Sequence, residues 1–143
     1  ASATTQALAA ECDFFSIGTN DLVQYLLAVD RGNDRVASLY DPAHPAVLLT
    51  LRHVFRAARA RGIPCGVCGE LAGDPAWAAL LLGLGADSLS MSTPSLAEVR
   101  YVLRRSTVAE REALAGAAIG SSDPSATAAL LRTFAAERLR AKP

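Results

Sequence analysis

Residues 13–22 read Asp-Phe-Phe-Ser-Ile-Gly-Thr-Asn-Asp-Leu, and this stretch decides the fold. Its apolar first half predicts a short buried strand, which ends where the polar residues 18–21 begin a loop. Residues 22–29 are apolar again and predict one or two helical turns, with a further loop at the polar residues 30–34. A strand that ends in a polar loop and leads into a helix is the repeating unit of parallel α/β folds.

The same order of strand, polar loop and helix occurs twice more along the chain. From Pro45, apolar residues recur at steps of three and four while arginines occupy the opposite face, which predicts an amphipathic helix ending at Gly62. Further strands are predicted at residues 63–67 and 87–91. The predicted helix starts that follow are Asp74-Pro75, Thr93-Pro94, Thr107 with Glu110, and Asp123-Pro124.

The alternation of strands and helices predicts a parallel sheet. An open doubly wound sheet and a (β/α)8 barrel both fit this pattern, and periodicity alone does not choose between them. We expect one unit in which residues 1–105 hold three β/α units and residues 106–143 form terminal helices.

Composition narrows the classes of function. The chain has 143 residues, of which 51% are hydrophobic, so it can bury a core. Fourteen Lys and Arg balance fourteen Asp and Glu, which argues against a nucleic-acid partner. The longest apolar runs are shorter than the roughly 20 residues of a membrane-spanning helix. Three cysteines in a chain of this size fit a reducing compartment, so we expect a cytoplasmic protein with no membrane insertion.

The loops after the predicted strands are the place to look for chemistry, because parallel α/β folds bind ligands beyond the carboxyl ends of their strands. Asn20 and Asp21 follow the first strand, and Asp21 offers the hard oxygen that magnesium or manganese takes. Arg31 can clamp a phosphate with its planar donors. The alternative is that Asn20 and Asp21 cap a helix or shape a turn, and that Arg31 is a surface ion-pair partner.

The second loop places a thiol, Cys68, between glycines at the end of a strand, where the backbone can approach a ligand closely. An inert buried cysteine is the alternative. Cys65 and Cys68 form a C-x-x-C, but strand alternation points them to opposite faces and no second pair exists, which argues against zinc or redox chemistry. His44 and His53 are assigned surface or capping roles.

Taken together, three stretches resemble the signature of the phosphoenolpyruvate-utilising enzymes: residues 13–22, residues 28–34 (Ala-Val-Asp-Arg-Gly-Asn-Asp) and residues 66–74 (Gly-Val-Cys-Gly-Glu-Leu-Ala-Gly-Asp). Within the family, residues 28–34 with Leu-Tyr-Asp-Pro at 39–42 look most like the Enzyme I branch, the phosphoenolpyruvate-protein phosphotransferases. This resemblance implies an α/β fold that forms about the last three units of a (β/α)8 TIM-type barrel, followed by terminal helices.

The resemblance also implies roles for single residues. Cys68 matches the family's general acid, which protonates the enolate left when phosphorus departs. Glu70 is expected to orient that thiol, with Gly69 between them. The implied contacts to substrate and metal are Asn20 and Arg31 for the phosphate and Asp21 for Mg²⁺.

The resemblance implies partners as well. The phosphoryl group of phosphoenolpyruvate is expected to pass to a histidine on a separate domain and then to the histidine phosphocarrier protein, driving sugar uptake, in an enzyme that dimerises through its barrel. A barrel needs about 250 residues, so five strands are absent and we expect the isolated chain to be inactive. A pyruvate phosphate dikinase or phosphoenolpyruvate synthase parent, and a non-catalytic interaction module, remain alternatives.

Overall fold

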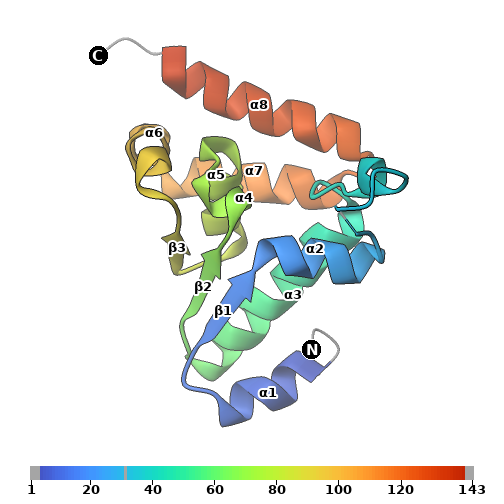
Figure 1. The fold of residues 1–143 in the computed structure, drawn as a ribbon. Coiled ribbons are helices and arrows are strands. Elements are labelled where there is room, and N and C mark those ends of the chain that lie inside the picture. Colours follow the sequence, from blue (N-terminus) through green and yellow to red (C-terminus); the bar gives the residue numbers. More distant parts are fainter. Residues whose placement is uncertain (1–3, 31, 141–143) are drawn as a thin grey trace.

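The computed structural model describes residues 4–30 and 32–140, as a helix-rich α/β fold around a small parallel sheet (Figure 1). In chain order the elements are α1 (Thr5–Glu11), β1 (Phe15–Gly18), α2 (Thr19–Leu27), the 3₁₀ helix η2 (Ala37–Leu39), α3 (Pro45–Arg61), β2 (Cys65–Cys68), α4 (Glu70–Gly73), α5 (Pro75–Leu84), β3 (Ser88–Ser90), α6 (Thr93–Arg104), α7 (Val108–Gly120) and α8 (Pro124–Arg140). The α/β class predicted from the sequence is therefore confirmed.

The three strands run parallel in the order β1-β2-β3. Ile17 pairs with Val67, and Val67 pairs with Leu89, so one row of apolar side chains crosses the sheet on a single face. This face packs against α3 and forms a buried cluster with it. The opposite face carries small side chains, and its serines on β1 and β3 are exposed. Strand alternation thus gives the sheet one core face and one accessible polar face.

A second apolar cluster lies away from the sheet, between α5 and the helices that follow it. It joins fully buried residues of α5 and α6, such as Leu80 and Val102, to Leu131 and Phe134 of α8. Trp77 packs against both clusters and connects them. Figure 1 shows α7 and α8 at the end of the molecule opposite α1. The terminal helices α7 and α8 therefore pack against α5, at the other end of the molecule from α1.

Most predicted helix boundaries are confirmed. α3 starts at Pro45 and ends before Gly62, whose φ of 70° is the left-handed conformation that glycine adopts at a helix end. The side chain of Asp74 caps α5 by accepting from two backbone N–H groups. Thr107 and Glu110 form a complete capping box at the start of α7.

Two predicted loops are wrong. Residues 19–21 form the first turn of α2, which begins directly after β1, and residues 70–73 form the short helix α4. Asp21 and Glu70 each lie in the first turn of their helix, where a carboxylate interacts favourably with the helix dipole. The helix α1 was not predicted. Among the described residues, no helix is long and apolar enough to cross a bilayer.

Candidate functional site

Three of the residues singled out in the sequence, Cys68, Asn20 and Glu70, meet at the carboxyl ends of β1 and β2. Cys68 is the last residue of β2 and pairs in register with Gly18, the last residue of β1. Asn20 lies in the first turn of α2, directly after β1. Glu70 starts α4, directly after Gly69 and two residues beyond Cys68. Two chain segments about fifty residues apart are thus brought to one edge of the sheet because their strands are parallel neighbours.

Cys68 is half-buried and its sulfur has polar contacts on two sides. Its thiol donates to the backbone carbonyl of Ile17, with 3.6 Å between sulfur and oxygen. The hydroxyl of Ser16 donates to the sulfur over 4.0 Å. The carbonyl of Cys68 accepts a hydrogen bond of 3.2 Å from the hydroxyl of Thr19, whose side chain is fully buried. Both contacts to the sulfur come from β1, and the contact to the carbonyl comes from the first residue of α2.

Gly69 allows the two segments to approach this closely. Its φ is 115°, a conformation that side chains rarely adopt. A Cβ at this position would lie 2.7 Å from the hydroxyl oxygen of Thr19 and 3.4 Å from the amide oxygen of Asn20. Any larger residue would therefore push the start of α2 away from the strand end that carries Cys68.

Asn20 links the start of α2 to the start of α4. Its amide nitrogen donates to a carboxylate oxygen of Glu70 over 3.4 Å. Its amide oxygen is buried and has no hydrogen-bond partner among the described residues. A buried polar atom without a partner is costly and needs an explanation, and an absent ligand or ion is one. The bond between Asn20 and Glu70 fixes which way this oxygen faces.

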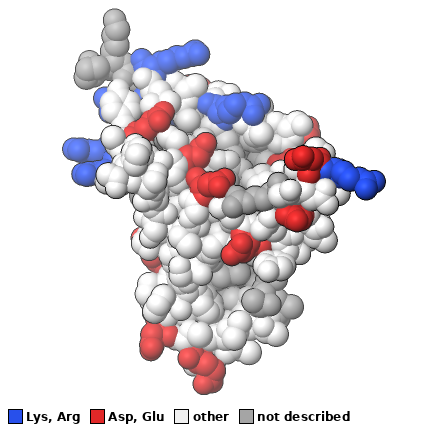
Figure 2. Space-filling model, viewed as in Figure 1, with Lys and Arg blue, Asp and Glu red and all other residues white. Residues whose placement is uncertain are grey.

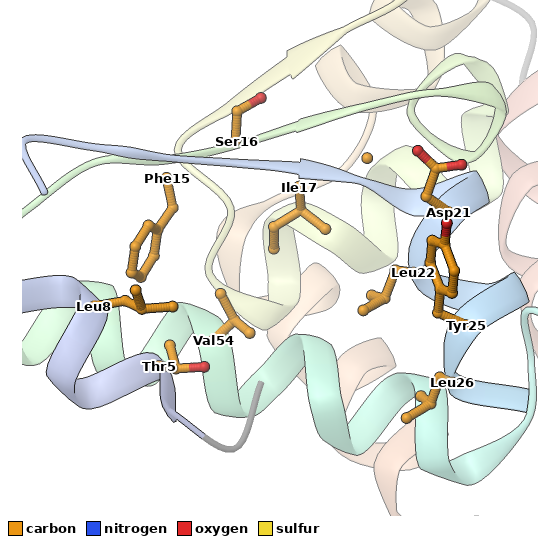
Figure 3. Close-up of a pocket in the computed structure, with 11 residues that line it drawn as sticks. Thr5, Leu8, Phe15, Ser16, Ile17, Asp21, Leu22, Tyr25, Leu26 and Val54 are labelled. Carbon is orange, nitrogen blue, oxygen red and sulfur yellow. The ribbon is translucent and has the colours of Figure 1, made fainter. Parts of the chain in front are cut away.

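The polar residues open onto two separate hollows. Asn20 and Glu70 line an open groove of about 690 Å³ that also reaches Ser90 and Ser92 at the end of β3. Asp21 lines a different groove, of about 520 Å³, along the free edge of β1. In Figure 3, Asp21 lies at one end of this second groove. Asn20 and Asp21 are neighbours in sequence, yet they face different openings of the described chain.

The other cysteines and the histidines have simpler environments. Burial, and then the nearby Asp87, raise the pKa of the Cys65 thiol to about 11, so it stays protonated at neutral pH. Cys65 is buried in the core and Cys68 is accessible from the opposite face, which confirms the prediction that they point apart. His44 caps α3 by accepting from a backbone N–H, and His53 is exposed, as predicted.

A magnesium ion fits this site only in part. No group of three His, Cys, Asp or Glu side chains suited to a metal occurs in the described ranges. Magnesium, however, commonly takes only one or two protein carboxylates and completes its shell with water and phosphate oxygens. Asp21 fits the role of one such carboxylate because it is exposed at the strand ends. The residues present therefore suit one side of a metal site. Arg31 lies outside the described residues.

Sequence reasoning missed Ser16 and the structural part played by Thr19. Both lie in the stretch at residues 13–22, yet neither a strand serine nor a buried threonine looks functional by itself. The register between β1 and β2 is the signal that identifies them. Once Gly18 is paired with Cys68, Ser16 falls on the same face of the sheet as the thiol.

Comparison with known proteins defines the class. The family model described as "PEP-utilising enzyme, PEP-binding domain" matches residues 1–108, and the chain belongs to this family.

Within the family, the chain is similar to proteins that carry phosphotransferase names. It is 54% identical over 108 residues to an Escherichia coli K12 protein named "Phosphoenolpyruvate-dependent phosphotransferase system". The aligned residues are 76% of this chain and 14% of that relative. It is 46% identical over 127 residues to the phosphoenolpyruvate-protein phosphotransferase of Borreliella burgdorferi, covering 89% of this chain and 22% of the relative. The Haemophilus influenzae protein of the same name is 47% identical over 119 residues, or 83% and 21% of the two chains. The chain thus spans about a fifth or less of the length of these relatives.

Proposed function

We propose that this chain is part of a phosphoenolpyruvate-protein phosphotransferase of the Enzyme I type, in which it supplies the acid that completes the reaction. The observation that carries the proposal is the arrangement around Cys68. A thiol held from β1 lies at the carboxyl ends of parallel strands, one residue from the glycine that packs against Asn20. This is where parallel α/β folds bind their substrates.

The chemistry assigns each residue a task. When the phosphoryl group leaves phosphoenolpyruvate, the remaining enolate needs a proton on its methylene carbon. The S–H bond of Cys68 breaks, the proton forms a C–H bond that gives pyruvate, and the electron pair stays on sulfur as a thiolate. Asn20 and Arg31 orient the phosphate. Magnesium held by Asp21 would neutralise phosphate charge. Glu70 keeps the amide of Asn20 in place, and its role in orienting Cys68 stays a prediction.

The charges of the described site explain why we expect the isolated chain to be inactive. The described residues that line the groove at Asn20 include the carboxylates of Glu70 and Asp74 and no Lys or Arg. Figure 2 shows acidic side chains across the middle of the face it presents, with arginines mainly toward its margins. A substrate that carries a phosphate and a carboxylate would be repelled here. The required cations are then Arg31, magnesium and groups from the rest of a longer protein.

The sheet topology favours an arc of a barrel over an open doubly wound sheet. Its strand order follows the chain order without a reversal, whereas a doubly wound sheet reverses at a switch point. Right-handed connections between successive parallel strands then put the connecting helices on one face, as in a barrel. The described chain would supply the last three β/α units of that barrel.

The free edge of β1 is where the preceding unit would join. Figure 3 shows Phe15, Leu8 and Val54 turned into an apolar groove beneath this strand, while Ser16 points to the other side. Phe14, next to β1, is 64% exposed. An exposed apolar strand edge attracts further chain and is normally covered. In a longer protein, we propose, the preceding strand and helix cover the apolar part of this groove and leave open the end at which Asp21 lies.

The partners follow from the same proposal. The phosphoryl acceptor is a histidine on a separate domain, which passes the group to the histidine phosphocarrier protein of the sugar uptake system, in the cytoplasm. The parent would act as a homodimer through its barrel. A dikinase or synthase parent remains the alternative. Phosphoryl-transfer assays distinguish the three enzymes by their acceptor: the phosphocarrier protein for the phosphotransferase, adenosine monophosphate with pyrophosphate for the dikinase, and adenosine monophosphate with phosphate for the synthase.

Titration calorimetry with phosphoenolpyruvate and magnesium tests the proposal. We expect no binding by the 143-residue chain alone, and binding once the chain is joined to the preceding barrel segment of a relative. In the joined protein, Asn20→Ala should weaken binding, whereas Cys68→Ala should bind and fail to turn over. Binding by the chain alone would contradict the expected inactivity. Absence of binding in the joined protein would favour a non-catalytic interaction module.

A further inference from the structure

Helix α3 carries a charge pattern that the proposed function does not use. It contains four arginines and no Asp or Glu, although the whole chain has no net charge. Arg59 and Arg61 lie in its last turn, where a cation interacts favourably with the helix dipole. Arg52 and Arg56 lie one turn apart in the middle of the helix, where the dipole offers no such benefit. Two like charges at this spacing repel each other, so the pair needs another explanation.

The two central arginines have no polar partner in the described chain. No ion pair or hydrogen bond joins either guanidinium to another described residue. Arg52 is half-buried, so part of its side chain is already withdrawn from water, while Arg56 is exposed. By contrast, Arg138 of α8 is ion-paired with Glu110. The N–H groups of Arg52 and Arg56 are therefore available to a ligand.

A hollow lies directly beside this pair. Helix α1 packs against α3 (Figure 1), and the two helices border an open groove of about 460 Å³, which we call the α1–α3 groove. Arg52, His53 and Arg56 line it from α3, and Gln6 lines it from α1. All four side chains can donate hydrogen bonds, and no Asp or Glu is among the described lining residues. The remaining lining residues are Leu49 and two alanines of α3, so the groove joins cationic donors to an apolar wall.

We propose that the α1–α3 groove binds a small organic molecule that carries a diphosphate. A guanidinium holds phosphate oxygens through two parallel N–H groups. The Cβ atoms of residues four apart on a helix are about 5–6 Å apart, so Arg52 and Arg56 can each bind one of two neighbouring phosphates. The volume of the groove falls within the range of small-molecule sites, about 300–1,000 Å³, which leaves room at the apolar wall for the organic part of the ligand.

This groove is separate from the site assigned to phosphoenolpyruvate. The grooves at Asn20 and at Asp21 share no lining residue with it. The buried side of α3 packs against the core face of the sheet, whereas Cys68 is reached from the opposite face. The inference therefore stands or fails independently of the proposed function.

Titration calorimetry of the 143-residue chain with pyrophosphate, without added metal, tests the inference. The parent chain should bind this probe. Orthophosphate and phosphoenolpyruvate carry a single phosphate each, so at the same ionic strength they should bind at least about ten-fold more weakly. Arg52→Gln and Arg56→Gln should each weaken the binding of pyrophosphate by about five- to twenty-fold, the effect of losing a charged donor in a groove open to solvent.

Arg59→Gln is the matched control for these variants. It removes the same charge from the same helix, but Arg59 is exposed and does not line the groove, so this variant should keep the affinity of the parent chain. Amide spectra recorded by ¹H–¹⁵N NMR locate the bound probe, and we expect shifts at Gln6 and residues 49–60. Shifts confined to the strand ends at residues 18–21 and 66–70, an equal loss in Arg59→Gln, or no binding of pyrophosphate would overturn the inference.

Discussion

Replacement of Gly69 by alanine should destabilise the chain and displace the site together. At a φ of 115° and ψ of −172°, a side chain costs about 1–3 kcal/mol in backbone strain. The new Cβ would also lie 2.7 Å from the hydroxyl of Thr19, a fully buried side chain that has little space to move. Turning that hydroxyl away would lose its bond to the carbonyl of Cys68, worth about 1 kcal/mol. We therefore expect a loss of about 2–4 kcal/mol in the free energy of unfolding, measured by urea denaturation.

Gly62→Ala is the matched control for this change. Gly62 also has a positive φ, of 70°, but a Cβ there would meet nothing within 4 Å, so only strain of about 1 kcal/mol is expected. Thr19→Ala combined with Gly69→Ala should be less destabilising than the sum of the single changes, by about 1 kcal/mol, because removing the hydroxyl relieves the overlap. The reasoning is refuted if both glycine variants lose the same stability, or if the double variant is strictly additive.

Two further predictions concern the terminal helices. Gly83→Ala should destabilise the chain by about 1–3 kcal/mol or prevent folding, because its Cβ would overlap the backbone carbonyl of Arg111 where α5 meets α7. Thermal unfolding measures this effect. An unchanged melting temperature would contradict the close packing of the two helices. The hydrogen bond from the Thr107 backbone, and then its hydroxyl, hold the pKa of Glu110 below its ordinary value. Ionised Glu110 therefore stabilises the fold at pH values above its unfolded-state pKa, and this stability is lost as pH falls through the lower folded-state pKa. Urea denaturation of the parent chain and of Glu110→Gln from pH 7 to pH 3 measures the effect. The difference between their free energies of unfolding should shrink over that range.

Helices with strong end signals were predictable from the sequence, and short elements were not. α3 and α5 carry apolar periodicity together with Pro45 and Asp74 at their starts, and these local features determine their boundaries. The first turn of α2 was predicted as a loop because Thr19 and Asn20 are ordinary turn residues. Tertiary contacts decide their conformation, since the hydroxyl of Thr19 is satisfied by a carbonyl of the neighbouring strand. Propensity over a few residues carries no information about such a partner.

The site was predictable as a set of residues and not as a geometry. Cys68, Asn20 and Glu70 were identified through the family signature, and the structure brings them to the same strand ends. The unpaired oxygen of Asn20 and the contact between Ser16 and the sulfur depend on how β1 and β2 are aligned. A shift of the register by one residue would move Ser16 and the thiol to opposite faces. A signature read along the chain does not contain this information.

The alignment of β1 and β2 also explains why the signature is divided between two distant stretches. The thiol of Cys68 is on β2, whereas both polar contacts to its sulfur come from β1. The hydrogen bond to the backbone carbonyl of Cys68 comes from the hydroxyl of Thr19, at the start of α2. Gly69 in turn affects the position of α2, because a side chain at residue 69 would overlap Thr19 at the start of that helix. Neither stretch can hold its reactive group alone, because each is positioned by atoms of the other. A substitution in residues 13–22 should therefore affect Cys68 as directly as a substitution beside it.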